Sequence, residues 1–105
     1  MTSSSPEQLE FDVHPDGSIL VAGELDLASA PLLRTVLTNQ IAAGLEEIVL
    51  DLSQLAFCDS SGLSVLVWAH QELAAAGGKL VLRAPSNPVQ RLLSTTHLEG
   101  ELNIQ

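Results

Sequence analysis

The residues with the most potential for chemistry lie in the segment 58–64, which reads Cys-Asp-Ser-Ser-Gly-Leu-Ser. The apolar run at residues 48–50 predicts a buried strand before it, and the run at residues 63–76 predicts a helix after it. The first amide groups of a helix lack intrahelical partners, and the helix dipole is positive there. Two adjacent hydroxyls and a carboxylate at such a place fit a structural cap, an anion site or a modified serine.

The simplest of these interpretations is a structural cap formed by Asp59 or Ser60, which contributes only about 1 kcal/mol. A cap needs one oxygen, however, and three polar side chains follow one another here. Gly62 costs the first helical turn about 1 kcal/mol relative to alanine. We therefore expect another molecule to approach closely at this glycine.

The helix that follows is apolar on nearly all sides. One stripe at helical spacing contains Leu63, Leu66, Val67, His70 and Leu73, and a neighbouring stripe contains Ser61, Val65, Trp68 and Glu72. If the first stripe meets a sheet, the second leaves Trp68 near the surface on the same side as Ser61. Exposed apolar area around an aromatic residue is common at protein interfaces, so this side is a candidate docking surface.

The rest of the chain predicts the elements that position this segment. Strands are expected at residues 9–14, 18–24, 46–51 and 79–83, and helices between a cap at Asp26 or Ser29 and Gly44, from about Ser60 to Ala76, and after a cap at Ser86 or Asn87. An opening hairpin followed by alternating helices and strands predicts an α/β layer fold with a mixed sheet. The unbroken apolar run 48–50 predicts that the sheet is covered on both faces. The pattern after Thr95 is too weak to assign.

Length and charge limit the function. With 105 residues we expect a single domain at residues 9–105 after a polar, serine-rich tail at residues 1–8. A net charge of -9, with 13 acidic and 4 basic side chains, opposes binding to nucleic acid or to anionic membranes and favours a basic protein surface as partner. No apolar run is long enough to span a membrane and no signal peptide opens the chain, so we expect a cytoplasmic protein.

Three other side chains have structural and functional interpretations. Asp26 follows a strand and precedes a helix, where a carboxylate commonly forms a turn or a cap. Asp51 either accepts hydrogen bonds from the amides of the turn at residues 51–53 or shapes a recognition loop. Cys58 is a candidate redox sensor at a helix N-terminus, but the neighbouring Asp59 opposes thiolate formation. For Cys58 we therefore expect a buried, apolar role.

Catalysis and metal binding find little support. His14, His70 and His97 are far apart and have no ligand spacing, so we expect no metal site. A hydrolase triad built on Ser61 would need a Gly-x-Ser-x-Gly elbow, which is absent. Because Cys58 is the only cysteine, the chain has no internal disulfide framework. We expect a binding module without catalytic residues or cofactors.

Three segments, in this order, resemble a known family. They are Gly-Glu-Leu-Asp at residues 23–26, Ile-Val-Leu-Asp-Leu-Ser at residues 48–53 and Phe-Cys-Asp-Ser-Ser-Gly-Leu at residues 57–63. Together they are similar to a STAS domain of the anti-sigma factor antagonist type. The resemblance covers residues 9–98 and implies the STAS fold, which has a mixed sheet of four to five strands with helices packed mainly on one face.

The resemblance also implies a function. In the family the second serine of the motif is phosphorylated, which corresponds to Ser61, and the unmodified antagonist holds an anti-sigma factor and so frees a sigma factor for transcription. The implied partners are an anti-sigma factor that is also a serine kinase and a PP2C-type phosphatase, and Asp26 would lie in the kinase-facing surface. The alternative is a stand-alone STAS subunit of another assembly, such as a stress-signalling complex or a lipid-transport ATPase. The expected partner surface comprises Asp26, Asp59, Ser60, Gly62, Ser64, Val65 and Trp68.

Overall fold

The structure is a computed structural model that describes residues 9–105; the tail predicted at residues 1–8 lies outside these residues. Five strands and three helices follow one another along the described chain. They are β1 (Leu9–Val13), β2 (Ser18–Leu25), α1 (Ala30–Ala42), β3 (Glu47–Cys58), α2 (Ser60–Ala75), β4 (Lys79–Arg83), α3 (Asn87–Thr96) and β5 (Asn103–Ile104).

The strands form one mixed sheet in the order β1-β2-β3-β4-β5. β1 and β2 form the predicted hairpin and pair antiparallel through a tight turn, in which Gly17 has a φ of 93° and the Asp16 carboxylate accepts a hydrogen bond of 2.9 Å from the Ser18 amide. All other neighbouring strands pair parallel. The C-terminal segment, which the sequence left unassigned, ends in the short strand β5 beside β4.

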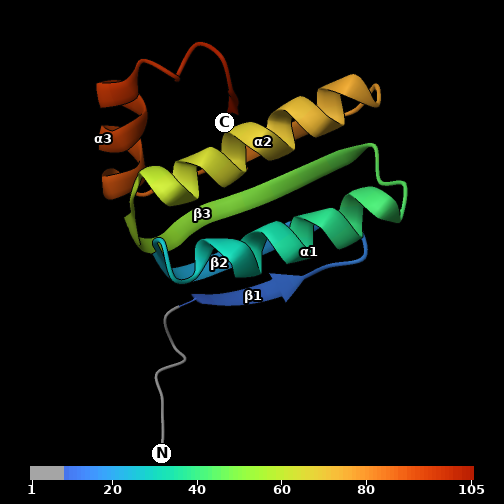
Figure 1. The fold of residues 1–105 in the computed structure, drawn as a ribbon, viewed down its shortest axis with the longest axis horizontal. Coiled ribbons are helices and arrows are strands. Elements are labelled where there is room, and N and C mark those ends of the chain that lie inside the picture. The colour runs from blue at the N-terminus through green and yellow to red at the C-terminus, as the bar shows by residue number, and fades with distance from the viewer. Residues whose placement is uncertain (1–8) are drawn as a thin grey trace, which may run out of the picture.

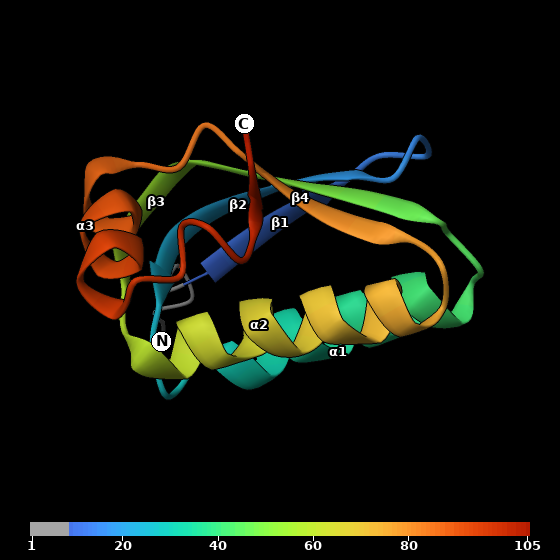
Figure 2. The ribbon, with the colours of Figure 1, turned by 90° about the horizontal axis from the view of Figure 1, so that it is seen from above.

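The helices α1 and α2 lie side by side under one face of the sheet, and α3 lies at one end of it (Figures 1 and 2). Each of the two helices returns the chain between parallel strands, so α1 and α2 run in the same direction. The core between sheet and helices is aliphatic, with Leu50, Leu66 and Leu82 all fully buried. This arrangement confirms the predicted α/β fold with a mixed sheet and helices mainly on one face.

Strand β3 is longer than predicted. It continues past residue 51 to Cys58 because the second half of β2 offers it a partner, with Ala22 opposite Gln54 and Leu25 opposite Cys58. Two register shifts in this pairing insert extra residues into the β3 side. The buried residues of this part are therefore three apart, at Leu52, Leu55 and Cys58, and not two apart as in a regular strand.

The prediction that the sheet is covered on both faces is wrong. Val49 points away from the helix layer and is half-buried, on the same side as the ion pairs Lys79–Glu47 at 3.7 Å and Arg83–Asp51 at 3.8 Å. The apolar run at residues 48–50 gave a false signal because one valine on an open face does not differ, in sequence, from a valine in a buried layer.

Truncating Leu66 tests the core between sheet and helices. We expect Leu66→Ala to lower the free energy of unfolding by about 2–5 kcal/mol, because the cavity is enclosed on all sides. Leu27→Ala is the matched control, since Leu27 is 76% exposed and its truncation should change stability by less than about 0.5 kcal/mol. Urea unfolding followed by circular dichroism measures both. Equal losses for the two variants would contradict this packing.

Candidate functional site

The motif at residues 58–64 lies where β2 and β3 end and where α1 and α2 begin (Figure 2). The parallel pairing of the two strands brings both strand ends to the same edge of the sheet. The Asp59 amide donates a hydrogen bond of 3.1 Å to the Leu25 carbonyl, which joins the two loops directly. Residues more than thirty positions apart in sequence thus form one site.

Asp59 is the N-cap of α2. Its extended backbone places the carboxylate so that Oδ1 accepts hydrogen bonds from the amides of Ser61 at 2.9 Å and of Gly62 at 3.1 Å. The cap therefore requires the carboxylate alone, and neither serine hydroxyl contributes to it. The Ser64 hydroxyl instead donates to the Ser60 carbonyl at 3.0 Å, one turn earlier.

Ser60 and Ser64 are exposed, and Ser61 is half-buried. Together with Trp68, the two exposed serines line a shallow hollow of about 280 Å³ on the outer surface of α2. Ser61 lies on the flank of the helix that faces α1, and its side chain is not sealed in the interior. A catalytic group of another protein can therefore approach this end of the helix.

Gly62 is buried, and the expectation that its small size leaves room for another molecule is wrong. A Cβ atom at this position would overlap Leu25 Cγ, would come within 2.7 Å of Leu25 Cδ2 and would come within 3.1 Å of Cys58 Sγ. The glycine is required because the start of α2 packs directly on the end of β2. Its place in the motif has an internal, structural cause.

Asp26 organises the loop between β2 and α1. Its Oδ1 accepts hydrogen bonds from the amides of Ala28 and Ser29, each at 3.0 Å. The fully buried Ser29 donates its hydroxyl to the Glu24 carbonyl at 2.7 Å. Ser29 occupies the N-cap position of α1, but its side chain makes no capping bond, and the same holds for Ser86 at α3. The turn-forming role of Asp26 is confirmed, and its contact with a partner remains a prediction.

The flank of α2 next to Ser61 is less open than predicted. Val65 is buried, with 6% of its surface exposed, so the expectation that it lines an open docking surface is wrong. Trp68 is half-buried and packs against the hydrophobic core, and Arg34 of α1 lies over its ring with the guanidinium carbon 4.1 Å from the ring centroid. Arg34 was not predicted to be part of this surface. The available signal was that it is the only basic residue before Lys79.

Cys58 is buried beside the motif, as predicted. Burial, and next the charge of Asp59, raise the pKa of its thiol from 9.0 to about 12. The thiol is therefore almost entirely protonated at neutral pH, which is opposite to the state that a redox sensor needs. Cys58 packs as a small apolar residue.

Asp51 lies within β3 and not at the motif. Its Oδ1 accepts hydrogen bonds from the Ser53 hydroxyl at 2.7 Å and from the Ser53 amide at 3.0 Å, and these lower the pKa of the carboxyl. The charge of Arg83 acts in the same direction. The predicted local role of Asp51 is confirmed, although the residues around it form a strand and not a turn.

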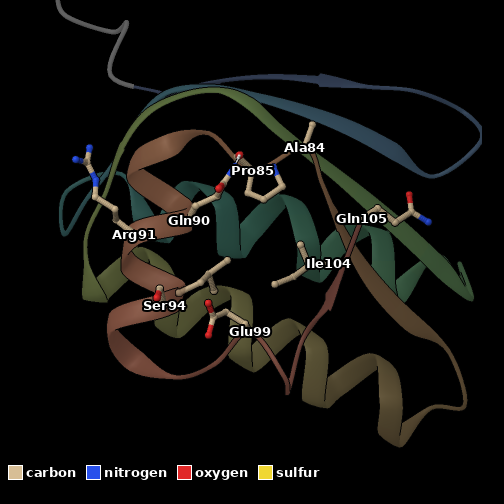
Figure 3. Close-up of a pocket in the computed structure, with 9 residues that line it drawn as sticks. Ala84, Pro85, Gln90, Arg91, Ser94, Glu99, Ile104 and Gln105 are labelled. Carbon is tan, nitrogen blue, oxygen red and sulfur yellow. Dashed lines mark hydrogen bonds between the residues drawn. The ribbon is translucent and has the colours of Figure 1, made fainter.

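A larger cavity of about 690 Å³ lies away from the motif, between α3 and the C-terminal strand (Figure 3). Gln90, Glu99 and Ile104 are among its lining residues, and none of them comes from the segment 58–64. Within residues 9–105, no group of side chains could hold a metal ion, and no helix is long and apolar enough to cross a bilayer.

Comparison with known proteins identifies the family to which the chain belongs. It belongs to the STAS domain family, which matches residues 9–105. An anti-sigma-B factor antagonist of Listeria monocytogenes is 35% identical over 95 residues, which cover 81% of this chain and 82% of that protein. The crystal structure of an anti-sigma factor antagonist from Mycobacterium paratuberculosis has a TM-score of 0.81 at 27% identity and covers 97% of this chain and 89% of that one.

The Bacillus cell fate determinant SpoIIAA in its phosphorylated form has a TM-score of 0.69 at 22% identity, over 92% of this chain and 90% of that one; this likeness concerns the fold. The family predicted from the three sequence segments is confirmed. The relatives in sequence and structure support an anti-sigma factor antagonist function, which is that of a regulatory binding module.

Replacing the buried glycine tests its packing role. We expect Gly62→Ala to lower the free energy of unfolding by about 1–3 kcal/mol, because the added methyl group displaces Leu25. Gly100→Ala is the control, since a Cβ atom there meets nothing within 4 Å. Thermal unfolding measures both variants. If Gly62→Ala is as stable as the unmodified chain, the glycine does not serve this contact.

The thiol of Cys58 should be unreactive in the folded protein. A pKa of about 12 instead of 9.0 reduces the thiolate fraction at pH 8 by about a thousandfold. We expect carbamidomethylation by iodoacetamide at pH 8 to be at least about a hundredfold slower than for the urea-unfolded chain, as measured by intact mass. Similar rates in the two states would show that the thiol is exposed or activated.

Proposed function

We propose that this chain is an anti-sigma factor antagonist whose binding is switched by phosphorylation of Ser61. The unmodified protein binds an anti-sigma factor that is also a serine kinase, and so releases a sigma factor for transcription. Phosphorylation ends this binding, and a PP2C-type phosphatase restores it. The observation that carries the proposal is the half-buried Ser61, reachable at the first turn of α2, in a member of a family whose relatives are anti-sigma factor antagonists.

The fold supports a phosphate at this position. A phosphoserine adds a charge of about -1.5 to -2 near neutral pH, and the positive end of a helix dipole favours an anion. The Asp59 carboxylate already accepts hydrogen bonds from two of the free amides. The phosphate therefore adds to the negative charge at the start of the helix and leaves the cap in place. The domain therefore keeps its structure when it is modified.

Phosphorylation affects the docking of a partner more strongly than it affects the fold. A partner that covers this end of α2 removes water from the phosphate and from Asp59 together, and like charges without counterions are costly in a desolvated interface. A loss of about 2.8 kcal/mol in binding free energy corresponds to a hundredfold weaker complex. The switch thus acts through charge and bulk at the interface and needs no rearrangement of the domain.

Two exposed serines beside Ser61 make a selective test possible. We expect Ser61→Ala to abolish phosphorylation by the cognate anti-sigma factor and ATP, because the acceptor hydroxyl is missing. Ser60→Ala and Ser64→Ala are the matched controls, since neither side chain takes part in the cap. Intact-mass measurement reports the addition of one phosphoryl group. Persistent phosphorylation of Ser61→Ala would refute the assignment of the site.

Binding is measured separately on the same proteins. Calorimetry with the anti-sigma factor should show at least about a hundredfold weaker binding after phosphorylation, and dephosphorylation by the phosphatase should restore the affinity. Equal affinities of the two forms would refute the switch. Recovery of a membrane transporter in place of an anti-sigma factor, in a pull-down from the native host, would favour a subunit of another assembly.

A further inference from the structure

The contact between Arg34 and Trp68 lies on the same side of the helix layer as Ser61. Ser61 and Trp68 are seven residues apart in α2, which is close to two full turns, so both face α1. Arg34 projects from α1 across the boundary between the two helices and covers the ring of Trp68. Arg34, a cation of α1, is therefore in contact with the same flank of α2 that contains Ser61.

Arg34 lies near the start of α1, and Ser61 lies in the first turn of α2. α1 and α2 run in the same direction and begin at the same end of the sheet (Figure 2). With a rise of about 1.5 Å per residue, Ser61 and Trp68 are about 10 Å apart along α2, and Arg34 is about 6 Å from the start of α1. Because Arg34 is exposed, rotation about its side-chain torsions is free to turn the guanidinium away from Trp68 and toward the start of α2.

The other basic residues of the described chain are placed elsewhere. Lys79 and Arg83 pair with Glu47 and Asp51 on the open face of the sheet, and Arg91 lies on α3. Within residues 9–105, no carboxylate comes within ion-pair distance of Arg34. Arg34 is thus the one cation of the α1–α2 layer, and it makes only an aromatic contact, which is weaker than a charge-assisted hydrogen bond to a phosphate.

We propose that Arg34 binds the phosphate of phosphorylated Ser61 and leaves the ring of Trp68 when it does so. The guanidinium would supply a positive charge beside the phosphate, whereas the Asp59 carboxylate at the helix cap is itself negative. Its departure uncovers the indole ring, so phosphorylation changes a second part of the α2 surface besides the serine itself. This inference rests on the proposed modification of Ser61.

The test uses a chain with phosphoserine inserted at position 61 during synthesis, so it needs no kinase. In ³¹P NMR titrations, Arg34→Gln should raise the second pKa of the phosphate by about one unit, because an adjacent cation favours the dianion. Arg34→Lys should retain part of the effect. Arg91→Gln, which removes the same charge from α3, should leave the titration unchanged. An equal phosphate pKa in the Arg34→Gln and Arg91→Gln proteins would overturn the proposal.

The tryptophan gives a second readout, since Trp68 is the only tryptophan and the chain contains no tyrosine. We expect phosphoserine at position 61 to increase quenching of Trp68 fluorescence by acrylamide in the Arg34 protein and to have no effect in the Arg34→Gln protein. Unchanged quenching in the Arg34 protein would show that the ring stays covered and would also overturn the proposal. Circular dichroism confirms that each variant is folded.

These results are independent of the kinase and anti-sigma factor experiments. If the anti-sigma factor does not phosphorylate Ser61, the proposed function fails even when Arg34 alters the phosphate pKa. If Ser61 is phosphorylated but Arg34 does not affect the phosphate, only the present inference fails.

Discussion

The site depends on the close contact between the end of β2 and the start of α2. The hydrogen bond from the Asp59 amide to the Leu25 carbonyl fixes the two chain segments, and Gly62 lets the first turn of α2 rest on the Leu25 side chain. This contact sets the direction in which α2 leaves the sheet. It therefore also sets which side of the helix is buried and which side presents its serines to a partner.

Within four consecutive residues at this contact, two residues have a structural role and two do not. Asp59 caps the helix and Gly62 packs in the interior, so both serve the fold. Ser60 and Ser61 lie between them and take no part in the cap through their hydroxyls. A residue that has no structural task can be modified at little cost in folding free energy, which suits a reversible switch. The motif thus contains two residues that the fold requires, Asp59 and Gly62, and two serines whose hydroxyls it does not require.

The charge distribution agrees with this division. The chain is strongly acidic, yet two of its four cations are paired with carboxylates on the open face of the sheet, far in the fold from the motif. The helix layer keeps a single arginine, which stacks on the single tryptophan. In the α1–α2 layer this exposed arginine is therefore the one Lys or Arg side chain that is available as a counter-charge to the proposed phosphate. Adding one phosphate group to the surface of this layer would strongly change the electrostatic attraction between this surface and a partner.

Much of the fold was predictable because local patterns and tertiary packing agree. The opening hairpin, the helix after residue 59 and the strand at residues 79–83 all lie where the sequence predicts them. Strand β3 was predicted too short, because bulges changed the spacing of Leu52, Leu55 and Cys58 from the regular period of two. A bulge depends on the partner strand, which local sequence does not show.

The sequence by itself determined the family, the motif and the candidate serine, since these depend on residue types in a given order. Only the tertiary structure decided the reason for Gly62, the burial of Val65 and the cover over Trp68. Gly62 meets Leu25 and Trp68 meets Arg34, two residues that are distant in sequence and come close only through the parallel pairing of β2 with β3. Periodicity gives the direction of a side chain about its own helix, but the neighbour that it meets is fixed by how the layers pack.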